Sequence, residues 1–337
     1  MKVEVIAEIA QGFEGNLHQA ILFVKAAASA GANSVKFQLV YADELATNDY
    51  EYYDLFKSLE MPDEDWDLLA KYSRKNNIDL SLDIFGLKGL KLSEKIGVKS
   101  VKLHPTDITN LSLLKNISNS KINKIILGVG GANLDEIEIA LNILKNKNLD
   151  LLLGFQSYPT ENRHNQIFRL KSLNNYLKNN YNNFRIGFAD HASPIDGLKY
   201  GLACAAIGAG AQVLEKHLTL GKVMKIEDYE SALNPDEFKE FVYIMHECAL
   251  ACGNLINISN DFNMSSSEKK YRKNIRRHVV SSKDLKKGSI IQPSDLILKR
   301  SSSEKVIYDM SLVYNKVLKK DVKFNTPINS SMLDKLK

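Results

Sequence analysis

Two histidines stand at the ends of short apolar runs in the middle of the chain. His191 follows the run 184–189, with Asp190 directly before it, and His217 closes the run 212–217. Two imidazoles from neighbouring strands, with acids close by, suit a divalent metal ion that keeps positions open for water and substrate. A lone histidine in such a place is more often a hydrogen-bonded structural residue, so the prediction depends on the matched pair. We therefore predict a metal site at His191 and His217.

Other polar side chains gather where further apolar runs end. A buried charge is costly unless it is paired or bound to a metal, so many charges at run ends indicate a functional site. Lys36 and Lys102 together indicate an anionic ligand, and His104 is a candidate catalytic residue or third metal ligand. The candidates at these run ends are Glu8, Gln11, Glu14, Lys36, Gln38, Asp83, Lys102, His104, Thr106, Asp107, Gln156, Tyr158, Asp190 and Glu215.

A glycine-rich segment, GVGGAN (128–133), joins an apolar run to a helical stretch that Asn133 can cap. Glycines such as Gly128 and Gly130 would let backbone N–H groups approach an anion at the N-terminus of that helix. A tight turn that needs unusual backbone dihedrals explains the same glycines equally well. Both explanations stay open on the sequence alone.

These candidates need elements that bring the run ends together. Apolar runs alternate with helical stretches, which predicts a parallel sheet covered by helices. Eight such units in about 250 residues favour a (β/α)8 TIM barrel of the α/β class, whose active residues lie at the C-terminal strand ends. An open doubly wound sheet is the alternative, but no G-x-G-x-x-G motif follows the first run. The predicted strands are 3–9, 34–38, 78–84, 100–104, 124–129, 149–155, 184–189 and 212–217, and the predicted helices include 16–31, 64–77, 133–147, 193–210 and 235–252.

Composition narrows the class of protein. The 337 residues are 44% hydrophobic and 25% charged, with a formal net charge of +5. Basic residues form no stripe with interleaved aromatics, so nucleic-acid binding is disfavoured, while the mild positive charge favours anionic substrates. No apolar run reaches the roughly 18 residues of a membrane span, and the N-terminus lacks the features of a signal peptide. Three cysteines without a C-x-x-C pair suit a reducing compartment, so we predict a cytoplasmic protein.

The C-terminal quarter differs in composition from the rest. Residues 255–275 are polar, rich in serine and asparagine, and without periodicity, which predicts a linker. Residues 276–337 contain short strand-like runs and turns, which predicts a small domain with a marginal core of its own. We therefore predict a catalytic barrel over 1–254, a linker over 255–275 and a small domain over 276–337.

Several motifs together carry a family resemblance. AEIAQGFEG, SVKFQ, VKLHPTD, SYPT, GFADH and EKHLTL, in this order and spacing, resemble the sialic acid synthase family, which includes the spore-coat polysaccharide protein E group. The resemblance covers nearly the whole chain. It implies a barrel followed by a small antifreeze-like (SAF) domain. The segment RRHVVSSKDLKKGSIIQPSDLILKR resembles the start of that domain.

The resemblance also implies a chemistry. Such enzymes condense phosphoenolpyruvate with an N-acetylated hexosamine, typically N-acetylmannosamine, with a divalent Mn²⁺ or Mg²⁺ ion, and release phosphate. Lys36 and Gln38 would then face the carboxylate of phosphoenolpyruvate and Lys102 its phosphate. A domain-swapped homodimer would bring Arg277 of one copy to the sugar site of the other. By the same resemblance His191 and His217 would bind the metal, and the acceptor sugar and metal region would be lined by Glu14, Asp107, Tyr158, Glu215 and Asp228.

The sequence departs from the family pattern at several strand ends. Ser-Thr-Pro-Phe becomes Leu-Asp-Ile-Phe at 82–85, so that Asp83 places a negative charge where an anionic ligand is expected. Hydroxyl groups are also replaced at 104–107, 128–131 and Ala189, and an asparagine becomes Gln156. His104, Thr106 and the backbone of 128–131 are the groups that could replace them. A metal-assisted aldolase or lyase of a keto-sugar acid, or a catalytically silent component of polysaccharide synthesis, are therefore alternatives to the synthase.

Overall fold

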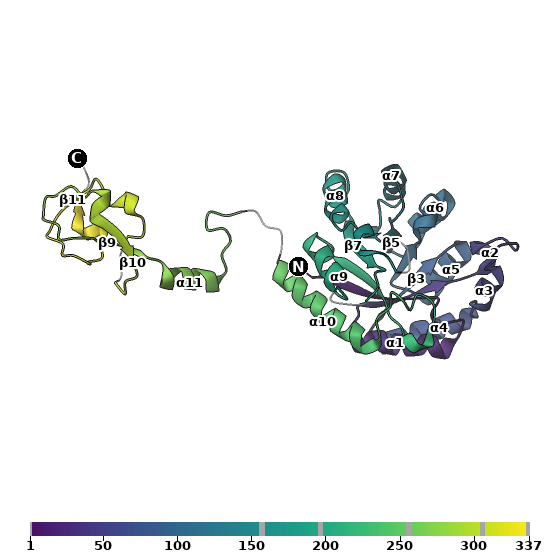
Figure 1. Ribbon diagram of the computed structural model, residues 1–337. Coiled ribbons are helices and arrows are strands. Elements are labelled where there is room, and N and C mark those ends of the chain that lie inside the picture. Colours follow the sequence, from purple (N-terminus) through teal and green to yellow (C-terminus); the bar gives the residue numbers. More distant parts are fainter. Residues whose placement is uncertain (1, 155–158, 195–197, 254–257, 304–306, 335–337) are drawn as a thin grey trace. The chain divides into compact units, whose positions relative to one another are not determined.

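Eight parallel strands close into a barrel in sequence order, with helices on the outside (Figure 1). The computed structural model describes residues 2–154, 159–194, 198–253, 258–303 and 307–334. The predicted (β/α)8 barrel is confirmed, and each predicted strand is present to within two residues at either end. The strands are β1 (Glu4–Ala10), β2 (Ser34–Leu39), β3 (Asp79–Ile84), β4 (Ser100–Leu103), β5 (Lys124–Gly128), β6 (Asn148–Leu153), β7 (Phe184–Asp190) and β8 (Val213–His217).

The helices begin and end where local chemistry dictates. The side chain of Asn16 accepts a hydrogen bond from the backbone N–H of Gln19 at the start of α1, and Gly31, at φ 84°, ends it. The helix predicted over 193–210 is shorter, because it begins at Gly201. None of the helices in the described ranges is long and apolar enough to cross a membrane. The barrel helices are α1 (Leu17–Ala30), α2 (Ala42–Leu45), α3 (Tyr53–Ser58), α4 (Asp63–Lys75), α5 (Leu87–Ile96), α6 (Leu111–Asn119), α7 (Leu134–Ile143), α8 (Phe168–Leu177), α9 (Gly201–Gly208) and α10 (Pro235–Cys252).

The barrel interior separates two groups of charges with an apolar layer. Successive residues of a strand point to opposite faces, so alternate positions face the interior. The apolar layer is one buried cluster made of Ile6, Ile126, Leu152, Ala189 and Val213. The residues on the opposite face of the strands belong to a different, much larger cluster that includes the helices. The charged side chains therefore lie at the two ends of the interior, on either side of this apolar layer.

Charged side chains at the N-terminal ends of the strands form ion pairs that link different strands of the barrel. The Arg185 guanidinium on β7 donates to both carboxylate oxygens of Asp150, at 2.7 Å each, and to Glu4 Oε2 of β1 at 2.7 Å. Lys124 of β5 also pairs with Glu4. Every charged group in this network has an opposite partner, so its chemistry is structural.

The second compact unit comprises Leu255–Lys337 and has its own apolar core. Part of the predicted linker is helical: α11 spans Ser266–Ile275 and starts with a capping box between Ser265 and Glu268. No residue of α11 is buried, so its sequence lacks the apolar periodicity that would have revealed it. The remaining elements are β9 (His278–Ser281) paired with β10 (Leu296–Lys299), and β11 (Val317–Leu318) paired with β12 (Leu333–Asp334).

Candidate active site

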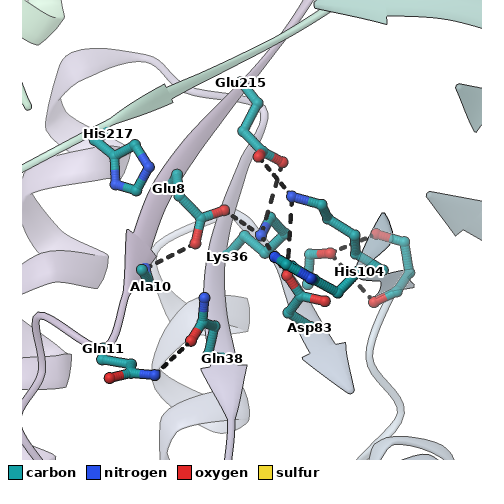
Figure 2. Close-up of polar contacts among 12 residues, drawn as sticks. Glu8, Ala10, Gln11, Lys36, Gln38, Asp83, His104, Glu215 and His217 are labelled. Carbon is teal, nitrogen blue, oxygen red and sulfur yellow. Dashed lines mark hydrogen bonds and ion pairs between the residues drawn. The ribbon is translucent and has the colours of Figure 1, made fainter. Parts of the chain in front are cut away.

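Five buried charged side chains meet at the C-terminal end of the barrel interior. Figure 2 shows Glu8, Lys36, Asp83 and Glu215 pointing toward one another. Each of the five is at most 4% exposed, and each comes from a different strand among β1, β2, β3, β4 and β8. Strand register brings them together, because Glu8 lies beside Lys36 and Asp83 lies beside Lys102. We call this set the charged cluster; it consists of Glu8, Lys36, Asp83, Lys102 and Glu215.

Each lysine of the charged cluster has one close carboxylate partner. Lys36 forms an ion pair with Glu8, and the Lys102 ammonium donates to Glu215 Oε1 at 2.7 Å. The third carboxylate lies between the two lysines at longer range: Asp83 Oδ2 is 3.4 Å from Lys36 Nζ and 3.8 Å from Lys102 Nζ. The contacts from β2 and β4 to Glu215 cross the barrel interior. Three carboxylates therefore face two ammonium groups.

The two glutamates of the charged cluster differ in proton affinity. Burial raises the pKa of Glu8 to about 7, although the Lys36 ammonium opposes the rise. Burial also disfavours ionised Glu215, but Lys102 and Lys36 outweigh it and lower the pKa of Glu215 to about 2. Glu215 is therefore a permanent anion at neutral pH, whereas Glu8 can hold or lose a proton.

His191 and His217 lie beside this cluster, at the ends of adjacent strands. Their ring centroids are 5.5 Å apart, and both side chains are buried. Burial lowers the pKa of both imidazoles, that of His191 to about 3, so both are neutral at physiological pH. A neutral imidazole is the form that binds a metal. Asp228 Oδ2 lies 3.7 Å from His217 Nδ1, and burial raises the pKa of Asp228 to about 7.

The histidine pair fits a divalent ion that has few protein ligands. Two neutral imidazoles from neighbouring strands supply nitrogen ligands, which first-row transition-metal ions bind more readily than Mg²⁺ does. Among the described residues, histidine, cysteine and acidic side chains form no group of three or more that could hold a metal. His191 and His217 are therefore the two described side chains that would hold such an ion.

Comparison with known proteins decides the family. The NeuB family model matches residues 23–257, and the SAF domain model matches residues 276–334. The chain belongs to the NeuB family. It is 32% identical to the N,N'-diacetyllegionaminic acid synthase of Campylobacter jejuni over 322 residues, which are 90% of this chain and 91% of that protein.

Further NeuB-family relatives agree. A pseudaminic acid synthase of Campylobacter jejuni is 25% identical, over 98% of this chain and 96% of its own length. The crystal structure of N-acetylneuraminic acid synthetase from Leptospira borgpetersenii matches with a TM-score of 0.71 and 28% identity, covering 82% of this chain and 93% of that chain. The resemblance found in the motifs is thus confirmed.

Several predicted residues of this NeuB-family barrel lie at the strand ends or on the loops that follow them. Gln38 accepts a hydrogen bond from Gln11 Nε2 at 2.9 Å. His104 Nδ1 lies 2.9 Å from Thr106 Oγ1 on the loop after β4. On the same loop Asp107 accepts from Asn110 Nδ2 at 3.2 Å.

Glu14 occupies a different position from the buried acids. It lies on the loop after β1, is exposed and has a positive φ of 51°. Its carboxylate accepts a hydrogen bond from Gln19 Nε2 at 3.1 Å. The structure therefore places Glu14 on the loop and Glu8 in the interior, and Glu8 is the acid that the motif comparison did not assign.

Asp190 has structural partners. Its carboxylate oxygen Oδ1 lies 3.2 Å from Lys216 Nζ and accepts a hydrogen bond from the Ala192 N–H at 3.0 Å. Lys216 in turn donates to the Ala192 carbonyl at 2.9 Å. Ala189 and Glu215, the residues just before this pair, face the interior, so Asp190 and Lys216 face the helices. These contacts hold the ends of β7 and β8 together and are the partners that the structure gives to Asp190, one of the predicted site residues.

Close packing explains the glycines after β5. A Cβ atom at Gly130 would lie 1.8 Å from the carbonyl oxygen of Gly154. A Cβ atom at Gly128 would lie 2.5 Å from Pro105 Cδ. At the start of α7, Asn133 and Glu136 form a capping box that uses N–H groups an anion would need. The positive φ of Gly131, 82°, supports the tight turn that the sequence left open, whereas Gly128 and Gly130 are required by close packing, which the sequence did not predict.

Three predicted residues remain. Gln156 and Tyr158 fall outside the described residues. Arg277 is exposed and directly precedes β9 in the second unit.

Proposed function

We propose that this chain condenses phosphoenolpyruvate with an N-acetylated hexosamine of the N-acetylmannosamine type. The product would be a sialic-acid-like nonulosonate, and phosphate would be released. The observation that carries the proposal is the buried pair of ammonium groups, Lys36 and Lys102, fixed by carboxylates beside the His191–His217 pair. The names of the relatives, which are synthases of nonulosonic acids, support the same reaction class.

The lysine pair suits a donor with two anionic groups. Charge-assisted hydrogen bonds from buried ammonium groups to carboxylate and phosphate oxygens are strong, because water does not compete. Lys36 and Gln38 lie two residues apart on β2, so both face the donor side, where they would hold the carboxylate. Lys102 on β4, separated from β2 by β3, would hold the phosphate. In the reaction, C3 of phosphoenolpyruvate bonds to the aldehyde carbon of the sugar, water adds to C2 and phosphate leaves.

We further propose that His191 and His217 hold Mn²⁺ or Mg²⁺. When bound, such an ion supplies Lewis-acid polarisation of the aldehyde oxygen. The two imidazoles would hold the ion beside the charged cluster. Because both are neutral at physiological pH, neither has to lose a proton before it binds the ion.

We also propose that the chain forms a homodimer in which Arg277 of one copy reaches the sugar site of the other. The family resemblance and the exposure of Arg277 support this assembly. Sedimentation equilibrium tests whether the chain forms a dimer. The Arg277→Ala variant is expected to raise KM for the sugar while the dimer stays intact.

Phosphate release tests the proposed reaction. Purified protein is incubated with Mn²⁺, phosphoenolpyruvate and a panel of N-acetylated hexosamines. We expect release with at least one sugar, and its loss in Lys102→Met. The matched control is Lys99→Met, an exposed lysine at the N-terminal side of the same strand, which should keep full activity. Silence of the wild type across the panel would overturn the proposal.

A further inference from the structure

Asp83 differs from the other two carboxylates of the charged cluster. Glu8 and Glu215 each hold one lysine closely, whereas Asp83 Oδ2 has only the longer contacts of 3.4 Å and 3.8 Å. Its second oxygen, Oδ1, is buried and accepts no hydrogen bond from the part of the chain that the structure describes, which is also true of Oε2 of Glu8 and of Glu215, so the longer lysine distances are what set Asp83 apart. Asp83 is therefore the carboxylate held most loosely, and it lies between the two ammonium groups.

The charged cluster contains three carboxylates but only two ammonium groups, and Asp83 is the carboxylate without a close lysine partner. Without it, Lys36 with Glu8 and Lys102 with Glu215 would form two neutral pairs. With it, and with Glu8 ionised, the cluster carries one more formal negative charge than positive charges. An extra buried anion disfavours the entry of another anion at the same lysines. Asp83 thus occupies the region that the anionic groups of a donor would need.

We infer that Asp83 is a specificity-determining residue of the donor subsite, an internal anion that competes with the donor for Lys36 and Lys102. This inference rests on the proposed function, because it takes the lysine pair as the donor's binding groups. Donor binding must break the Lys36–Asp83 and Lys102–Asp83 contacts or tolerate the repulsion. The penalty grows with the charge of the donor, and a phosphate monoester carries about two negative charges at neutral pH.

Asparagine is the substitution that isolates this effect. Asp83→Asn keeps the shape of the side chain and removes its charge. Because each lysine retains its close glutamate, the variant is expected to fold. Asp83→Thr adds the hydroxyl found in the family pattern. The matched control is Asp79→Asn, which removes an exposed carboxylate at the other end of the same strand, β3.

The test is isothermal titration of each protein with phosphoenolpyruvate and, separately, with pyruvate, without any sugar. We expect Asp83→Asn and Asp83→Thr to bind phosphoenolpyruvate at least tenfold more tightly than the wild type. Removing a like charge about 5 Å from an anion in a protein interior is worth tenfold or more. For pyruvate, which lacks the phosphate, we expect a smaller gain, and Asp79→Asn should change neither affinity.

Two results would overturn the inference. One is unchanged or weaker binding of phosphoenolpyruvate in both Asp83 variants, including an absence of binding in every protein. The other is an equal gain for both ligands, since competition between charges requires the more highly charged ligand to gain more. Because no sugar is present, failure of the sugar panel would leave this titration unaffected, and the two proposals fail separately.

Discussion

Replacing Lys102 by methionine tests whether charge balance holds the barrel interior together. The substitution keeps most of the aliphatic stem and removes an ammonium group that is 2.7 Å from Glu215 Oε1 and 3.8 Å from Asp83 Oδ2. Three buried carboxylates then face the single ammonium of Lys36. Removing one partner of a buried ion pair typically costs about 3–5 kcal/mol, so we expect a loss of this size in the free energy of unfolding.

A second substitution separates charge balance from packing. In Lys102→Met combined with Asp83→Asn, two carboxylates face one ammonium, which restores the formal charge of the wild-type cluster. We therefore expect the double variant to be more stable than the sum of the single effects predicts. Coupling between residues of one network is typically about 0.5–3 kcal/mol.

The single tryptophan makes the measurement specific for the barrel. Trp66 lies in α4, is 1% exposed and packs between Phe13 and Phe37. Its fluorescence during urea unfolding therefore follows the barrel and not the second unit. Lys99→Met is the control, because substitution of an exposed lysine should stay within about 0.5 kcal/mol of the wild type.

The reasoning would be refuted by either of two outcomes. In the first, Lys102→Met unfolds at the same urea concentration as Lys99→Met, so that the buried charge is not needed. In the second, the effects of Lys102→Met and Asp83→Asn on the free energy of unfolding simply add, so that the two residues do not interact. Unequal slopes of the unfolding curves would be checked first, because they change the meaning of the midpoint.

Further predictions concern proton binding, packing and metal. Burial raises the pKa of Glu8 from 4.5 to about 7, so between these pH values the folded state binds more protons than the unfolded state, and wild-type stability falls as pH rises. The stability of Glu8→Gln relative to the wild type should therefore rise by up to about 3 kcal/mol between pH 5 and 7.5. A stability difference that stays constant over this range would contradict the prediction. Gly130→Ala should lower unfolding stability by about 1–3 kcal/mol, measured by urea titration, because its Cβ would meet the Gly154 carbonyl. His191→Ala and His217→Ala should each abolish calorimetric binding of Mn²⁺, and retained binding would refute the metal assignment.

The sequence predicts the barrel well because its signals are local. Short apolar runs and capped helices recur at regular intervals, and the side chains at the ends of the runs include both lysines and both histidines. Alternation within a strand is also local, yet the sequence does not show which set of alternate residues faces inward. In the structure, the inward-facing residues of β1 include Glu8, which therefore joins the charged cluster. Asp190 of β7 faces outward, towards Lys216.

Other features depend on contacts between distant residues. The steric need for Gly130 appears only when the end of β6 brings the Gly154 carbonyl against it. The position of Asp83 between two lysines likewise requires the neighbouring strands β2, β3 and β4 in register. Helix α11 was missed for the opposite reason, since it buries nothing and leaves no apolar pattern.

The pairing of β1 with β8 has a consequence for synthesis of the chain. A ribosome delivers β1 first, but its second neighbour, beginning at Val213, arrives only after the other seven strands. Until then, β1 and β7 both present open edges that can pair with other chains. Lys36 and Lys102 also lack the Glu215 carboxylate until β8 has been synthesised, because Glu215 lies 113 residues after Lys102. Closure of the barrel and completion of the charged cluster are therefore one late event, and nascent chains that stop before β8 should be prone to aggregate.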